Sequence, residues 1–194
     1  MKYKLFAFTI ALAIILGGTC RFFHINKKMQ VYASTEKFYN IGDEVPLEKD
    51  FFFNIGESAE GYSITVLDTY YLPVDEFKKQ YNITDNSFLE FSEYVYMIKA
   101  NFKNNNSTTS ENTGISINRL VLQESSFISY PDTKAFMLIN EFDYAGFSLS
   151  PAQEREFIIP FGINEDYINI NRLNTGETRL VVSLYPNKKM INLH

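Results

Sequence analysis

Tyr94-Val-Tyr-Met-Ile-Lys-Ala-Asn-Phe-Lys103 is the stretch that decides the fold class. Its apolar side chains recur at every second position from Tyr94 onward, while lysine and asparagine fill the alternate positions from Lys99 to Lys103. Successive side chains of a strand point to opposite faces of a sheet, so a period of two predicts a β-strand with one buried and one solvated face.

Similar runs rich in β-branched and aromatic residues lie on both sides of this stretch, separated by turn-forming Gly, Asn, Asp and Pro residues. The clearest predicted strands are Tyr62–Tyr71, Ile115–Gln123, Glu156–Phe161 and Thr178–Tyr185. Weaker runs lie at Gln30–Ala33, Phe51–Phe53, Phe136–Ile139 and Met190–Leu193. This succession of short strands is typical of an all-β domain.

Two short helices are predicted between the strands. The first covers Asp75–Tyr81, with Asp75 as the N-cap and Phe77 and Tyr81 on one face. The second starts at Ser150–Gln153, which offers a cap, a proline at the first helical position and a capping-box glutamine.

These patterns predict an immunoglobulin-like two-sheet antiparallel β-sandwich with one or two short helices, preceded by an N-terminal hydrophobic helix. A small closed barrel is the alternative. The chain has no Trp and one Cys, so no intramolecular disulfide joins the sheets. Its 18 Phe and 13 Tyr are therefore expected to supply the packing between them.

The N-terminus has the pattern of a secretory signal or a signal anchor. Residues 5–20 are uncharged and mostly apolar, and two lysines precede them. We expect residues 1–28 to form a signal peptide or membrane anchor with a juxtamembrane basic segment, and residues 29–194 to form one extracytoplasmic β-sandwich domain. The expected location is the cell membrane, with a single N-terminal anchor.

Cys20 ends the apolar run and is the candidate lipidation site. A bacterial lipoprotein usually carries Leu three residues before its cysteine and a small residue just before it. Here Gly17 and Thr19 occupy those places, and Leu16 is one position too early. A cysteine with no role at the membrane is the competing interpretation.

Charge is distributed unevenly along the chain. Residues 1–28 hold five of the 18 basic residues and none of the 23 acidic ones, so the remainder carries 13 basic and 23 acidic residues, a formal charge of −10. Phosphates repel such a domain, which argues against nucleic acid as a partner.

Six parts of the sequence carry a family resemblance: Arg21–Lys28, Tyr39–Val45 with Phe51–Phe52, Gly61–Val66, Asp75–Tyr81, Val95–Asn104 and Glu156–Phe161. In these stretches the chain resembles a group of uncharacterised immunoglobulin-like domains, membrane-anchored or lipoproteins, from Gram-positive bacteria. The resemblance implies a fold and a location but no activity and no site residues.

Catalytic motifs are scarce. His24 lies beside the apolar segment and His194 is the last residue, and neither place holds a histidine rigidly for a Ser-His-Asp arrangement. No phosphate loop, dinucleotide fingerprint or Cys/His zinc spacing is present. We therefore predict no catalytic, cofactor-binding or metal-binding residues. Glu154 and Glu156 share one face of a strand, which a solvated surface explains.

The leading hypothesis is a non-catalytic, membrane-tethered extracytoplasmic domain that binds a protein partner at the cell envelope. The alternative is a ligand-binding lipoprotein that recognises a carbohydrate or peptide through exposed aromatic residues. Neighbouring aromatics in Phe51–Phe53, Tyr70–Tyr71 and Phe88–Phe91 face opposite sides of a strand, so some are expected at the surface. An envelope hydrolase with two carboxylates is the third hypothesis.

Overall fold

The computed structural model describes residues 12, 14–24, 35–52, 59–84, 89, 91–108, 114–166 and 177–194. The chain divides into two units, Met1–Ser34 and Thr35–His194. The predicted boundary between residues 28 and 29 and the predicted strand Gln30–Ala33 lie outside the described residues.

In the first unit, residues 14–24 are helical and their side chains are exposed. Within the described part of the chain, no helix combines the length and the apolar character that a membrane crossing needs.

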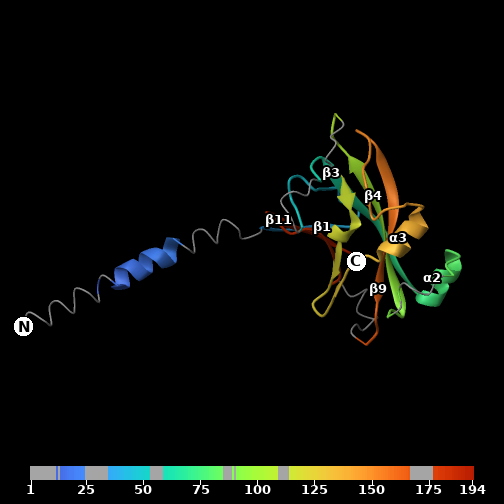
Figure 1. Ribbon diagram of the computed structural model, residues 1–194, viewed down its shortest axis with the longest axis horizontal. Helices are drawn as coiled ribbons and strands as arrows, with labels where there is room; N and C mark the ends of the chain where they lie inside the picture. The colour runs from blue at the N-terminus through green and yellow to red at the C-terminus, as the bar shows by residue number, and fades with distance from the viewer. Residues whose placement is uncertain are drawn as a thin grey trace, which may run out of the picture. The chain divides into compact units, whose positions relative to one another are not determined.

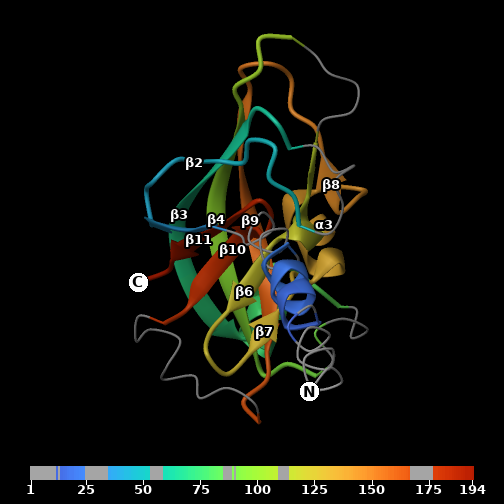
Figure 2. The ribbon, with the colours of Figure 1, turned by 90° about the vertical axis from the view of Figure 1, so that its left-hand side faces the viewer.

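The second unit is a sandwich of two main sheets (Figure 1). The four-stranded sheet has the order β2-β3-β4-β9, with β2 Val45–Pro46, β3 Tyr62–Pro73, β4 Tyr94–Asn104 and β9 Glu154–Ile163. The five-stranded sheet has the order β1-β11-β10-β6-β7 (Figure 2), with β1 Thr35–Asn40, β11 Asn187–Asn192, β10 Arg179–Ser183, β6 Val121–Gln123 and β7 Ile128–Ser129.

One strand pair departs from the predicted antiparallel arrangement. β1 runs parallel to β11, with Glu36 opposite Lys188 and Phe38 opposite Met190. The other pairs of both main sheets are antiparallel. The sandwich is therefore mixed, because the first described strand joins the edge formed by the last one.

The predicted strands at 62–71, 94–103, 156–161 and 178–185 are confirmed as β3, β4, β9 and β10. The single predicted strand Ile115–Gln123 is wrong. Its start forms β5, Ile115–Ser116, which pairs with β8, Gly146–Phe147, in a small separate sheet. A 3-10 turn at Ile117–Arg119 then redirects the chain into β6.

The helices differ from prediction in three ways. α2 covers Val74–Gln80, but Pro73 is its N-cap and no side chain caps it. The predicted strand Phe136–Ile139 lies instead in α3, Thr133–Asn140, where Asp132 accepts a hydrogen bond from the Ala135 N–H. At Ser150 the expected helix is a turn, because the chain enters β9 directly after Gln153.

The core between the sheets joins aromatic and aliphatic side chains, as the composition predicts. From the four-stranded sheet come Tyr62, Tyr96, Phe102, Phe157 and Phe161, and from the five-stranded sheet come Leu122, Leu180, Val182 and Ile191. Phe157 is the centre of the aromatic part, with its ring centroid 4.3 Å from that of Phe147 and 5.8 Å from that of Phe102.

β4 is buried on both faces at its start. Val95 and Met97, on the face away from the main core, pack with Val74 and Phe77 of α2. Figure 1 shows α2 on the side of the four-stranded sheet that faces away from β1 and β11. The alternation of apolar and polar residues is therefore restricted to the second half of the strand, from Lys99 onward.

Candidate functional site

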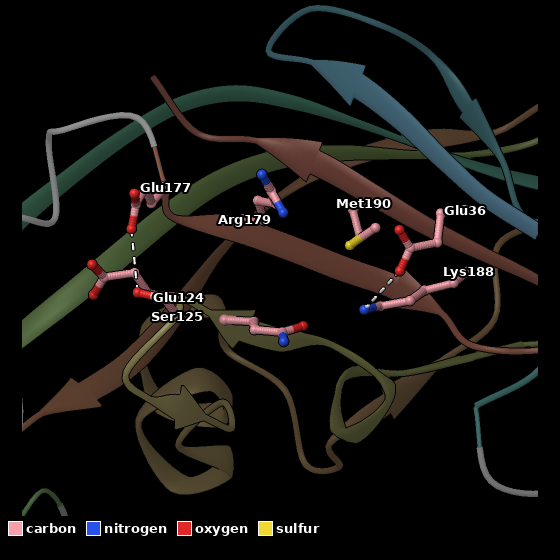
Figure 3. A pocket seen from close by; sticks show the side chains of 8 residues that line it. Glu36, Glu124, Ser125, Glu177, Arg179, Lys188 and Met190 are labelled. Atoms are coloured by element: carbon pink, nitrogen blue, oxygen red, sulfur yellow. Dashed lines mark hydrogen bonds and ion pairs between the residues drawn. The ribbon is translucent and has the colours of Figure 1, made fainter.

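A groove of about 320 Å³ lies on the outer face of the five-stranded sheet (Figure 3). Its lining comes from β1, β11, β10 and β6 and from the loops beside them: Glu36, Gln123, Glu124, Ser125, Glu177, Arg179, Lys188 and Met190. Polar side chains make up most of it, and Met190 is its apolar member.

Strand register places these side chains on one face. In β11, Lys188 and Met190 point to the outer face at alternate positions, while Ile191 points into the core. Across the sheet, Arg179 of β10 is the direct neighbour of Gln123 of β6. The groove therefore runs across four strands that come from three separate parts of the sequence, since β10 and β11 are consecutive.

Charged groups at the two ends of the groove have partners of different kinds. Lys188 Nζ lies 3.6 Å from Glu36 Oε1, an ion pair between β11 and β1. At the other end the Ser125 hydroxyl donates a hydrogen bond of 3.2 Å to Glu177 Oε2. Both contacts are drawn in Figure 3.

Two further charged side chains of the groove have no ionic partner among the described residues. Glu124 is 4% exposed, its Oε1 accepts no hydrogen bond, and its Oε2 has a long contact of 3.4 Å with the Ser126 hydroxyl. The guanidinium of Arg179 stacks over the Phe38 ring at 5.1 Å from the centroid, and its buried Nε donates to no group.

A second polar cluster lies inside the sandwich around Lys189, which is fully buried. Its ammonium contacts Asp50 Oδ2 at 2.6 Å and Glu48 Oε2 at 2.7 Å, and it also donates to the Pro46 carbonyl. Asp50 in turn accepts a hydrogen bond of 2.9 Å from the Asn187 amide group. The three donors of the ammonium are satisfied, so we interpret the cluster as a clamp that holds the segment after β2 against β11.

Residues that the sequence singles out occupy separate places. Cys20 and His24 are exposed on the helical residues 14–24, and His194 is exposed at the last position. Glu154 and Glu156 lie on a solvated face as predicted, where Glu156 pairs with Lys99 at 2.7 Å and Glu154 accepts from Asn101 at 3.3 Å.

The aromatic runs divide between core and surface. Phe52 is 5% exposed, whereas Phe91 is 79% exposed, and Tyr70 and Tyr71 are half-buried. Phe53 and Phe88 lie outside the described residues. Burial raises the pKa of Tyr70, whose hydroxyl also meets that of Tyr81 at 3.4 Å.

Sequence reasoning missed the groove, because its residues follow no motif. Arg179 and Lys188 occupy strand positions whose side chains face solvent, where charged residues are ordinary. Glu124 sits in a turn. The only available signal is that Arg179 opens an otherwise apolar strand, Leu180–Val182.

The fold and the groove define the class of protein by geometry alone: a two-sheet β-sandwich domain with a polar groove on one sheet. The chain belongs to the family described as a domain of unknown function, DUF5028, which matches residues 36–189. Nothing among the curated proteins matches it.

A solved structure of similar outline is an uncharacterised beta-sandwich protein from Clostridium difficile 630. The sequence identity is 11%, the TM-score is 0.39, and the alignment covers 83% of this chain and 96% of that chain.

Proposed function

We propose that this protein is a non-catalytic extracytoplasmic domain, tethered to the membrane through its N-terminal segment, that binds a protein partner at the cell envelope. The observation that carries the proposal is the groove on the outer face of the five-stranded sheet, where Glu124 and Arg179 lack ionic partners. Unsatisfied buried polar groups are rare in folded proteins, so each requires an explanation, and a bound partner is one.

The pattern of residues 1–28 supports the location. An apolar segment after two lysines is typical of exported proteins, and the remaining domain is strongly acidic. A domain with that charge is repelled by an anionic bilayer surface, so its sheet face remains available to a protein partner.

An immunoglobulin-like topology is part of the proposal, and the strand order supports it. The order β3-β4-β9 corresponds to strands A, B and E of an immunoglobulin domain, and β11-β10-β6-β7 corresponds to G, F, C and C′. The chain also crosses between the sheets from β4 to β6 and from β9 to β10, as B-to-C and E-to-F connections do.

Site-specific photo-cross-linking in native membranes tests the binding surface. A photoreactive amino acid at Gln123 lies in the groove, and one at Asn101 lies on the solvated face of the other sheet. We expect the Gln123 position to capture one protein in a defined adduct, while Asn101 captures none. Equal capture from both positions contradicts the proposed site.

The alternative is a lipoprotein that binds a carbohydrate or peptide. It is favoured by Phe38, which is 51% exposed and lies beside the groove under Arg179. Lipidation of Cys20 distinguishes the lipoprotein from the domain with an uncleaved membrane anchor. If Cys20→Ala releases the protein from the membrane fraction, the alternative is supported; if it remains there, an uncleaved anchor is supported.

A further inference from the structure

We infer that the groove binds a ligand that carries both a cationic nitrogen and a carboxylate, as an amino acid, a dipeptide or a neighbouring Lys–Glu pair on a protein does. This inference rests on the proposed function, since it specifies what that binding site recognises. The observation behind it is that two side chains of opposite charge, each with a buried atom that has no hydrogen-bond partner, line one groove.

Buried side-chain atoms without a hydrogen-bond partner are few in the described part of the chain. They are Asp50 Oδ2, Tyr96 Oη, Glu124 Oε1 and Arg179 Nε. Asp50 Oδ2 is neutralised by the ammonium of Lys189 at 2.6 Å, and Tyr96 is an uncharged core residue. Both charged groups that remain line the groove, and they lie on neighbouring strands or beside them.

Local structure keeps the two charges from neutralising each other. Arg179 is stacked on the Phe38 ring, which holds its guanidinium toward β1. Glu124 begins the turn after β6, where its backbone N–H donates to the Phe127 carbonyl at 3.0 Å. A carboxylate and a guanidinium left unpaired in this way are complementary to a ligand with an ammonium and a carboxylate.

The rest of the groove limits the ligand to a small or narrow group. Its volume of about 320 Å³ is at the lower end of the range for ligand sites. At its ends, Glu36 pairs with Lys188, and the exposed carboxylate of Glu177 accepts a hydrogen bond from the Ser125 hydroxyl. Glu124 and Arg179, which hold the buried atoms without partners, are therefore the charged groups that select a ligand with both signs of charge.

The test uses the full-length protein in detergent micelles and three probes: glycylglycine, its N-acetyl form and its C-terminal amide. The modified probes each lack one charge. We expect glycylglycine to bind at least about tenfold more tightly than either, because a charge-assisted hydrogen bond contributes that much affinity. Calorimetric titration measures the three affinities.

Two variants assign the charges to their residues. Glu124→Gln is expected to bind glycylglycine and its N-acetyl form equally, and Arg179→Gln to bind glycylglycine and its amide equally. Lys99→Gln, on the other sheet, is the control and keeps both preferences. Because Glu124 has no ionic partner to lose, and glutamine keeps an acceptor for the Ser126 hydroxyl, Glu124→Gln is also expected to melt at the same temperature as the wild type or above it.

A lower melting temperature for Glu124→Gln overturns the inference, since it reveals a structural partner for the carboxylate. If glycylglycine does not bind but Glu124→Gln and Arg179→Gln both abolish the cross-link from Gln123, the charge pair is supplied by the protein partner and the inference stands. If glycylglycine does not bind and the cross-link survives both variants, the inference is overturned while the proposed function is retained.

Discussion

At the scale of single residues, two adjacent lysines of β11 have opposite environments. Lys188 points to the outer face and pairs with an exposed glutamate across 3.6 Å. Lys189 points inward, is fully buried and meets two carboxylates and a carbonyl. Exposed ion pairs contribute little to stability, whereas breaking a buried pair leaves an uncompensated charge inside the protein.

Lys189→Met is therefore expected to lower the free energy of unfolding by about 3–5 kcal/mol, because it leaves Asp50 buried without a cation. The matched control Lys188→Met should change it by less than about 1 kcal/mol. Urea denaturation measures both. Adding Asp50→Asn to Lys189→Met should recover part of the loss, and equal effects of the two lysine variants would refute this interpretation.

Glu48 makes the clamp sensitive to acid. The hydrogen bond from Lys189, followed by its positive charge, lowers the pKa of the Glu48 carboxyl below its ordinary value of 4.5. A carboxyl whose pKa is lower in the folded state contributes stability above its unfolded pKa, and that contribution is lost as the pH falls through the folded value.

We therefore expect wild-type protein to lose stability below about pH 4.5, and Glu48→Gln to lose less over the same range. The difference in melting temperature between the two should shrink on acidification. Glu76→Gln, at an exposed position of α2, is the control variant. A difference between wild type and Glu48→Gln that stays constant on acidification would contradict the role of Glu48.

At the scale of elements, α3 and the segment before it cover the open edge of β9. The Asn140 side chain makes the two hydrogen bonds that a neighbouring strand would make with Ile158. It donates to the Ile158 carbonyl at 2.8 Å and accepts from the Ile158 N–H at 2.9 Å. Asp132 N–H donates to the Pro160 carbonyl, and the Ser129 hydroxyl to the Gly162 carbonyl. An uncovered edge strand is a template for aggregation, so this covering protects the sheet.

Asn140→Ala is expected to lower the free energy of unfolding by about 2 kcal/mol, because it leaves backbone groups of Ile158 without partners. It should also increase light scattering on heating, since the β9 edge is then open. Asn101→Ala is the control: its side chain makes one exposed contact, with Glu154. Similar losses for both variants would mean that Asn140 does not protect the edge.

At the scale of the whole molecule, the sandwich should not need the N-terminal segment to fold. The chain divides between Ser34 and Thr35, and both main sheets lie entirely within Thr35–His194. We expect a fragment of residues 35–194 to give the near-ultraviolet dichroism and the melting temperature of the full chain. A fragment without a cooperative transition would show that the first unit contributes to the core.

Much of the fold was predictable because strand periodicity is local. The runs beginning at Tyr62, Tyr94 and Glu156 form β3, β4 and β9. Each is rich in β-branched and aromatic residues, a property that can be read within a single segment. Prediction failed where a short apolar run fits either a strand or a helix. The predicted strand Phe136–Ile139 is helical, because Ala135, Met137 and Leu138 favour a helix and Asp132 caps the Ala135 N–H.

The sequence by itself determined the all-β class, the aromatic core, the acidic domain and the apolar N-terminal pattern, because these follow from composition and from spacing within single segments. Only the tertiary structure decided the parallel pairing of β1 with β11, the burial of Lys189 and the groove around Glu124 and Arg179. Each of these joins segments distant in sequence, and their register follows from packing of the whole sandwich rather than from any one stretch.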